Sequence, residues 1–243
     1  MDASIQVAEI RASRGASWIG EAWTLFAAAP MAWIGLCAGW IALTFALFVI
    51  PFIGGVAASF LQPVFFASFA IAAYRQAAGE RIVMADLFAG FKRNVRALVN
   101  LGAVLLMAQI VIVALMALLG LPMSPPASDQ PFSIADYAEA MSGKEWILAL
   151  GVALTILVKG SLWFAPQLIA FHGMGTAQAM RWSVYAAIAN IGALTVYGLA
   201  VLGLFIAALL PMPWVVGLVV VLPLTVISSY VGYRDVFEGV KSQ

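Results

Sequence analysis

Lys159 is the residue of this chain whose position most clearly suggests chemistry. It lies near the middle of a long apolar segment, residues 146–171, and no other Lys or Arg lies as deep in an apolar segment. A charge at the centre of a bilayer costs about 2.5–3.5 kcal/mol on insertion scales, so an ionisable residue found there is by default a candidate functional site. The sequence therefore predicts Lys159 as a residue that binds a ligand or a partner.

Several environments could accommodate the ammonium group of Lys159. Its four-carbon stem could carry the charge towards an interface, which would be a purely structural role. The group could instead line a polar cavity with Gln62, Gln109 and Gln167, or meet an acidic group supplied by a lipid, a substrate or a partner helix. All eleven Asp and Glu residues lie outside the predicted spans, so the chain itself offers no acid at this depth. Burial also disfavours the charged form of a lysine, which makes a neutral amine a further alternative.

The same segment continues into a motif that should interrupt a helix. Pro166 lacks a backbone N–H group and should kink or break the helix, and a break at membrane depth is tolerated only where it lines protein or a cavity. Trp163, one helical turn from Lys159, could cover the ammonium group through a cation–π contact. We therefore predict that Trp163, Pro166 and Gln167 join Lys159 as candidate binding residues. His172, at the predicted end of this helix, is either structural or a ligand or proton-relay residue, since a helix C-terminus favours protonated imidazole.

Other small and polar residues of the spans are predicted to hold helices together. Gly35 and Gly39 are four residues apart and would let another helix approach closely. Asn100 and Gln109 are predicted to form hydrogen bonds between helices, and Gln109 is also a candidate ligand-binding residue. The sequence contains no metal-ligand cluster, phosphate-binding loop or pair of intramembrane carboxylates. We therefore predict no catalytic residue, no metal and no cofactor.

The elements that must position these residues are membrane-spanning helices. The chain has 64% hydrophobic and 9% charged residues, whereas an ordinary soluble domain has about 25% charged residues. A spanning helix needs about 20 apolar residues, and six segments qualify: residues 31–50, 52–73, 97–121, 146–171, 191–210 and 214–233. The sequence predicts an all-α integral membrane protein, and its net charge of +1 gives no basis for binding nucleic acid.

The positive charges predict the orientation of these spans. Ten of the 12 Lys and Arg residues lie in segments that share one side: Arg11, Arg14, Arg75, Arg81, Lys92, Arg93, Arg96, Arg181, Arg234 and Lys241. The positive-inside rule then predicts that both termini are cytoplasmic. Residues 1–16 and 235–243 would be cytoplasmic tails around a single six-helix domain, residues 17–234. Residues 122–145 would form an external loop with one short helix at about 134–141.

The six spans group as three hairpins, each preceded by a short amphipathic segment predicted to lie in the cytoplasmic headgroup plane. The second helix of each hairpin contains a proline: Pro63, Pro166 and Pro223. These features predict a threefold internal repeat over residues 17–83, 84–175 and 176–234, related by an axis along the membrane normal. The alternative is that amphipathic helices and kinked spans recur in any protein with several spans.

Several short motifs carry a resemblance to a known family. They are Trp163-Phe164-Ala165-Pro166, Ala170-Phe171-His172-Gly173, Ala78-Gly79-Glu80-Arg81, Leu87-Phe88-Ala89-Gly90-Phe91 and Tyr233-Arg234-Asp235-Val236-Phe237. Over about residues 14–237, the chain resembles a proteobacterial family of six-span inner-membrane proteins of unknown function. Its hairpin layout is also loosely similar to the membrane domain fused to some glycerophosphoryl diester phosphodiesterases, whose catalytic domain this sequence does not contain. The resemblance implies an inner-membrane location and assigns no role to any residue.

These observations favour a non-enzymatic membrane subunit or scaffold that binds partner membrane proteins, membrane lipids or further copies of itself. The alternative is a transporter or permease-like protein for a small amphipathic or anionic solute, centred on Lys159. An enzyme acting on lipid ranks third, because no general base or nucleophile is predicted at a suitable depth.

Overall fold

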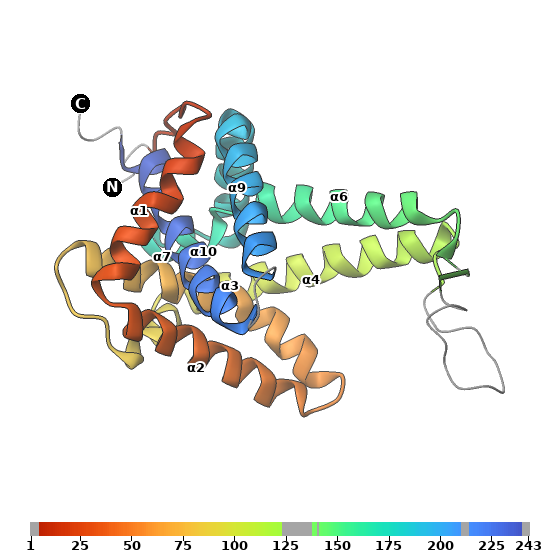
Figure 1. The fold of residues 1–243 in the computed structure, drawn as a ribbon, viewed down its shortest axis with the longest axis horizontal. Helices are drawn as coiled ribbons and strands as arrows, with labels where there is room; N and C mark the ends of the chain where they lie inside the picture. Colours follow the sequence, from red (N-terminus) through yellow and green to blue (C-terminus); the bar gives the residue numbers. More distant parts are fainter. Residues whose placement is uncertain (1–4, 123–137, 140, 210–213, 240–243) are drawn as a thin grey trace. The chain divides into compact units, whose positions relative to one another are not determined.

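The computed structural model describes residues 5–122, 138–139, 141–209 and 214–239 (Figure 1). All regular secondary structure within these residues is helical, which confirms the predicted fold class. The helices are α1 (Arg14–Ala28), α2 (Pro30–Phe48), α3 (Ile53–Ala77), the 3₁₀ helix η1 (Met84–Lys92), α4 (Val95–Leu118), α6 (Glu145–Ser161), α7 (Ala165–His172), α8 (Thr176–Ala189), α9 (Ile191–Leu209) and α10 (Trp214–Phe237). Of the short helix predicted at about 134–141, only residues 138, 139 and 141 are described and helical, and the rest lies outside the described residues.

Within the described residues, six stretches of helix are long and apolar enough to cross a membrane, as the sequence predicts. They are Pro30–Phe48, Ile53–Ala77, Val95–Leu118, Glu145–His172, Ile191–Ala208 and Gly217–Phe237. The short helices α1, η1 and α8 precede the three hairpins at the predicted places. The fourth stretch differs from a simple span, because it consists of two helices, α6 and α7, separated by a turn.

The chain divides into two compact units. The first unit contains residues 1–103 and 161–243, and the second contains residues 104–160. These boundaries do not coincide with those of the predicted repeat, and both the single six-helix domain and the threefold repeat stay predictions.

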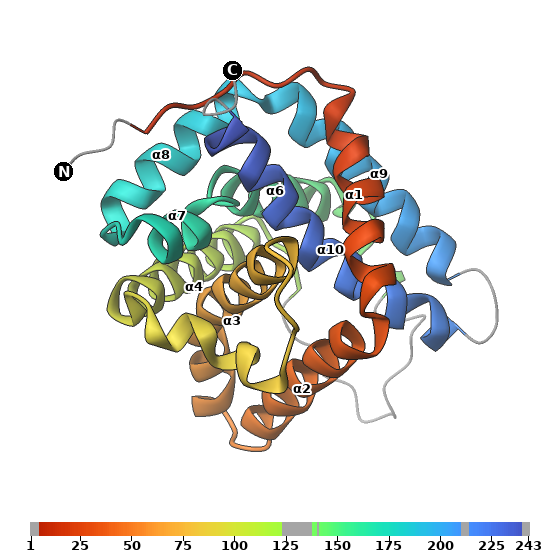
Figure 2. The ribbon, with the colours of Figure 1, turned by 90° about the vertical axis from the view of Figure 1, so that its left-hand side faces the viewer.

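The core of the first unit is built from the second helices of the hairpins. Of the residues in the apolar part of each helix, 56% are buried in α3 and 61% in α10, whereas only 17% are buried in α2 and in α9. Residues 165–170 of α7 are also buried. Helix α10 contacts both α1 and α3 (Figure 2). The second helices of the hairpins, α3, α7 and α10, therefore form the interior, and α2 and α9 lie on the outside.

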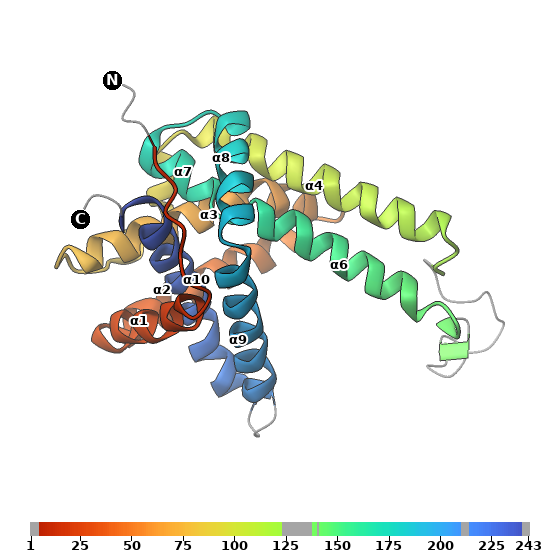
Figure 3. The ribbon, with the colours of Figure 1, turned by 90° about the horizontal axis from the view of Figure 1, so that it is seen from above.

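The second unit is a pair of antiparallel helices, formed by the part of α4 from residue 104 onwards and by α6 up to residue 160. The two helices run side by side (Figure 3). They approach closely at Gly151, where an added Cβ atom would lie 3.2 Å from Cγ of Met116. A helix advances by 1.5 Å per residue, so this contact sets which residues of the two helices lie at the same level.

Candidate functional site

The break between α6 and α7 is held by a serine of the neighbouring helix α8. Helix α6 ends at Ser161 and α7 begins at Ala165, with Pro166 in its first turn. The hydroxyl group of Ser183 donates to the carbonyl oxygen of Ser161 at 2.8 Å and accepts from the N–H group of Phe164 at 3.1 Å. Ser183 is completely buried. One side chain thus bonds to a backbone group on each side of the break. Such bonds are needed at membrane depth, because no water is available there to pair with the free backbone groups.

Gln167 also serves this break. Its side chain is completely buried, and its amide nitrogen lies 3.4 Å from the hydroxyl oxygen of Ser229 on α10. When the amide is turned over so that both of its polar atoms are satisfied, the nitrogen donates to the carbonyl oxygens of Trp163 and Phe164, at 3.1 and 3.2 Å. In either orientation the amide bonds to the interior of the first unit.

Trp163 lies beyond the end of the helix that carries Lys159. Because α6 ends at Ser161, the helical spacing that would bring the indole ring one turn from the ammonium group is not formed. The indole ring instead packs against Tyr197 on α9, with a centroid distance of 5.8 Å. The cation–π contact with Lys159 stays a prediction.

Lys159 lies on the exposed surface of α6, in the last turn of that helix. The free carbonyl groups of a helix C-terminus favour a cation there. Of the glutamines proposed to share a cavity with Lys159, only the half-buried Gln109 belongs to the same unit. Gln62 and Gln167 belong to the first unit.

His172 is the last residue of α7 and is exposed. Gly173 follows it with φ of 65°, a left-handed conformation that glycine adopts easily at the end of a helix. The hydroxyl group of Tyr233 lies 2.7 Å from Nε2 of His172, and the ring of Tyr233 stacks on Phe171 at 5.1 Å. His172 thus joins α7 to α10, and a ligand or proton-relay role for it stays a prediction.

The residues predicted to pack helices differ in their surroundings. A Cβ atom added at Gly35 would lie 3.3 Å from Sδ of Met84, and one at Gly39 would lie 3.2 Å from Leu87, so η1 lies against both glycines. Asn100, by contrast, is exposed on α4. The glycine pair admits a helix, although that helix is the short η1 and not another span.

Two polar clusters of the first unit were not predicted. The carboxylate of Asp235 accepts hydrogen bonds from Nε of Arg14 and from Nε1 of Trp18, both at 3.0 Å. The hydrogen bond with Asp235 raises the pKa of Arg14 above its usual value. The side chain of Glu21 bridges Arg14 and Arg234. These contacts join α1 to the end of α10.

The second cluster attaches residues 5–13, the N-terminal strap, to the first unit. The buried side chain of Asn190 accepts from the N–H group of Ile10 at 2.7 Å and donates to the carbonyl oxygen of Ala8 at 3.0 Å. The N–H group of Ala8 donates to the carbonyl oxygen of Val236 at 2.8 Å. In the sequence, Asn190 is recognisable only as an asparagine at the end of a predicted amphipathic helix. That position does not predict a contact with residues about 180 positions earlier in the chain.

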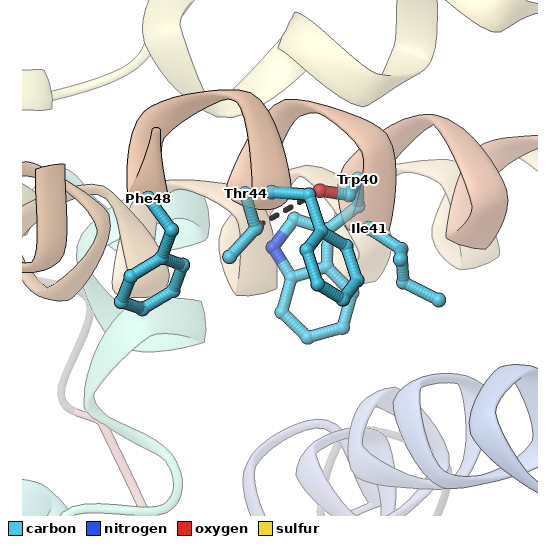
Figure 4. Close-up of a pocket in the computed structure, with 5 residues that line it drawn as sticks. Trp40, Ile41, Thr44 and Phe48 are labelled. Carbon is cyan, nitrogen blue, oxygen red and sulfur yellow. Dashed lines mark hydrogen bonds between the residues drawn. The ribbon is translucent and has the colours of Figure 1, made fainter. Parts of the chain in front are cut away.

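The outer face of α2 carries a shallow apolar hollow (Figure 4). It is lined by Trp40, Ile41, Thr44, Phe45 and Phe48. The hydroxyl group of Thr44 donates to the carbonyl oxygen of Trp40 at 2.9 Å, within the helix. A ligand in this hollow would meet mainly hydrocarbon, and in the sequence the same residues cannot be distinguished from a lipid-facing stripe.

Comparison with known proteins bears on location. The chain is 27% identical over 213 residues to a protein of Burkholderia thailandensis called "Probable inner membrane protein", and the similarity covers 80% of this chain and 74% of that protein. No model of a known protein family matches the chain, and no solved structure matches it. The similarity agrees with the six apolar helices of the structure. The chain is therefore a multi-pass protein of the inner membrane.

Proposed function

We propose that this protein is a non-enzymatic subunit or scaffold of the inner membrane, with both termini in the cytoplasm, that binds partner membrane proteins or lipids through its outer surface. The proposal rests on the hydrogen bonds formed by the polar groups of the interior. Among the described residues, every buried side-chain nitrogen and oxygen atom has a hydrogen-bond partner within the chain. An interior whose polar groups are all paired within the chain stabilises the fold and offers little to a solute.

The interior polar residues each join two parts of the first unit. Asp86 of η1 forms an ion pair with Arg75 of α3 and accepts from the N–H group of Val83 at 2.9 Å. The hydroxyl group of Ser68 accepts from the N–H group of Gly90 at 2.8 Å. These contacts hold η1 against α3, just as Ser183 holds α8 against the break. They account for the buried polar groups without a substrate.

The outer surface, in contrast, is rich in exposed apolar side chains. On α2 and the turn after it they include Phe45, Phe48, Val49 and Phe52. On α4, α6 and α9 they include Met107, Val111, Val152, Ile156, Leu199 and Leu202. Such a surface can bind lipid chains or the helices of another membrane protein.

Purification from native membranes in a mild detergent tests this proposal. We expect a tagged full-length chain to migrate as a complex larger than the monomer and to retain other membrane proteins or lipids at a fixed ratio. Size-exclusion chromatography with light scattering measures the mass, and mass spectrometry measures the ratio. A monodisperse monomer that carries no bound protein or lipid and transports a solute when reconstituted would contradict the proposal and favour the transporter.

A further inference from the structure

Lys159 is a cation near the middle of an apolar segment, and the proposed function has not yet explained its surroundings. None of the ion pairs formed among the described residues includes it. Two neighbours along its helix, Val152 and Ile156, are 58% and 66% exposed. With Lys159 they follow the spacing i, i+4 and i+7, which places all three on one face of α6. The ammonium group is therefore the polar element of an apolar outer face.

The contact between the two helices of the second unit indicates how deep Lys159 lies in the bilayer. Gly151 lies against Met116, and Lys159 is eight residues beyond Gly151 on an antiparallel helix. It is therefore roughly level with Ala108 and Gln109, eight and seven residues before Met116 on α4. Ala108 and Gln109 lie at the middle of the apolar segment 97–121, just as Lys159 lies at the middle of the segment 146–171. The contact and the two sequence patterns thus agree that Lys159 is close to the bilayer midplane.

This depth disfavours a lipid headgroup as the partner of Lys159. The hydrocarbon core is about 30 Å thick, so phosphate groups lie about 15 Å or more from the midplane. Glu145, at the other end of α6, is about 20 Å away along the helix at 1.5 Å per residue. A lysine stem of four methylene groups is much shorter than either distance.

The end of α6 offsets only part of the cost of this charge. A helix C-terminus stabilises a cation by about 0.3–1 kcal/mol at exposed positions, whereas a lysine at the centre of a span costs about 2.5–3.5 kcal/mol. The remainder requires a negative or strongly polar group at the same depth. A second copy of this chain, inserted in the same orientation, cannot supply a carboxylate, because all eleven Asp and Glu residues lie outside the predicted spans.

We propose that Lys159 forms an ion pair with a carboxylate on a transmembrane helix of a different protein, which docks along Val152, Ile156 and Lys159 of α6. This inference rests on the proposed function and specifies the partner: a helix with one Asp or Glu near the middle of its span. A helix fits this face better than a small solute, because Val152 and Ile156 expose apolar side chains over the two turns of α6 that precede the cation. The ion pair would give specificity to an apolar contact that by itself resembles the contact with lipid.

Designed peptides test this inference without knowledge of the natural partner. Three transmembrane peptides of Leu and Ala would carry a central Glu, a central Gln or a central Lys. Their association with the full-length protein would be measured by energy transfer between fluorophores in phosphatidylcholine vesicles. We expect the Glu peptide to associate about tenfold more tightly than the Gln peptide.

Substitutions at Lys159 identify the group responsible. Lys159→Met should remove the preference for the Glu peptide, and Lys159→Arg should keep it. Lys159→Glu should prefer the Lys peptide, which shows that the variant is folded and that the site pairs charges. Lys144→Met is the matched control, because Lys144 lies in the same unit beyond the apolar segment, and this variant should behave like the wild type.

Four results would overturn the inference. Equal association of the Glu and Gln peptides would exclude a carboxylate partner, and a preference that survives Lys159→Met would exclude this lysine. Uptake of a small carboxylate that depends on Lys159, without peptide association, would instead indicate a solute site. If Lys159→Met still co-purifies with the complex of native membranes, the scaffold role stands and only the pairing at Lys159 fails.

Discussion

The hydroxyl oxygen of Ser183 on α8 lies 2.8 Å from the carbonyl oxygen of Ser161, the last residue of α6. The same hydroxyl group accepts from the N–H group of Phe164 on the other side of the break. A helix interrupted at membrane depth must satisfy its freed backbone groups inside the protein. Ser183 does so from a different helix, so the break and the position of α8 depend on each other.

Ser183→Ala should therefore destabilise the protein. It removes the hydrogen bonds to the half-buried carbonyl group of Ser161 and to the buried N–H group of Phe164, and we expect a loss of about 1–2 kcal/mol. The midpoint of thermal unfolding in mild detergent measures the effect. Ser17→Ala is the control, because Ser17 is exposed on α1. If both variants unfold at the wild-type temperature, Ser183 does not hold the break.

Asn190→Ala should release the N-terminal strap while the helices remain folded. The substitution removes the hydrogen bonds to Ala8 and Ile10, and a loss of 1–2 kcal/mol would raise the open population about fivefold or more. Limited digestion with trypsin, which cuts after the exposed Arg11, measures the opening. Asn100→Ala is the matched control, since that asparagine is exposed. An unchanged rate of cleavage at Arg11 would show that Asn190 does not attach the strap.

Asp235→Asn should weaken the contact between α1 and α10. The side chain of Asp235 is only 14% exposed, but that of Arg14 is 41% exposed, so water replaces part of the interaction and the expected loss is about 1 kcal/mol. Glu80→Gln, which removes the more exposed partner of Arg75, should change stability by less than about 0.5 kcal/mol. Thermal unfolding in detergent compares the two variants, and equal effects would contradict the assignment.

The stability that the ion pair of Arg14 and Asp235 contributes depends on pH through the pKa of Arg14. The hydrogen bond with Asp235 raises the pKa of Arg14 above its usual value. A pKa raised in the folded state contributes stability that is fully present below the unfolded pKa, which for arginine lies far above neutral pH, and that is lost only as the pH rises through the folded pKa. The difference in stability between wild type and Asp235→Asn should therefore be the same at pH 7 and pH 9, and a difference that shrinks at pH 9 would contradict this expectation.

Gly39→Leu should displace η1 from α2. A Cβ atom at Gly39 already lies 3.2 Å from Leu87 and 3.3 Å from Met84, so a larger side chain forces the helices apart, at a cost of about 1–3 kcal/mol. Gly203→Leu is the control, because nothing lies within 4 Å of a Cβ atom at Gly203 on α9. The amount of folded protein recovered in detergent and its unfolding midpoint measure both variants. Equal recovery would show that η1 tolerates bulk at this position.

The sequence alone determined the fold class and the places of the helices. Runs of about 20 apolar residues require helices in a bilayer, because every backbone group must find a partner without water. Pro166 likewise indicated the interruption of the fourth span, since proline cannot donate the helical hydrogen bond. These features depend on neighbouring residues only, and a sequence displays them directly.

Only the tertiary structure decided how the polar residues are used. Gln167, Ser183, Asn190 and Asp235 bond to groups between about 20 and 220 residues away or to the backbone of the break, and nothing in a local pattern reports such contacts. The structure also ended α6 at Ser161, so that Trp163 lies outside the helix that carries Lys159, and it placed the lysine on an exposed face with Val152 and Ile156. Side-chain partners across a fold depend on how the helices rotate and pack, and the sequence does not reveal this, because side chains that face lipid are as apolar as side chains that face another helix. For this reason the apolar pattern specified which segments cross the membrane, and packing specified what each polar group contacts.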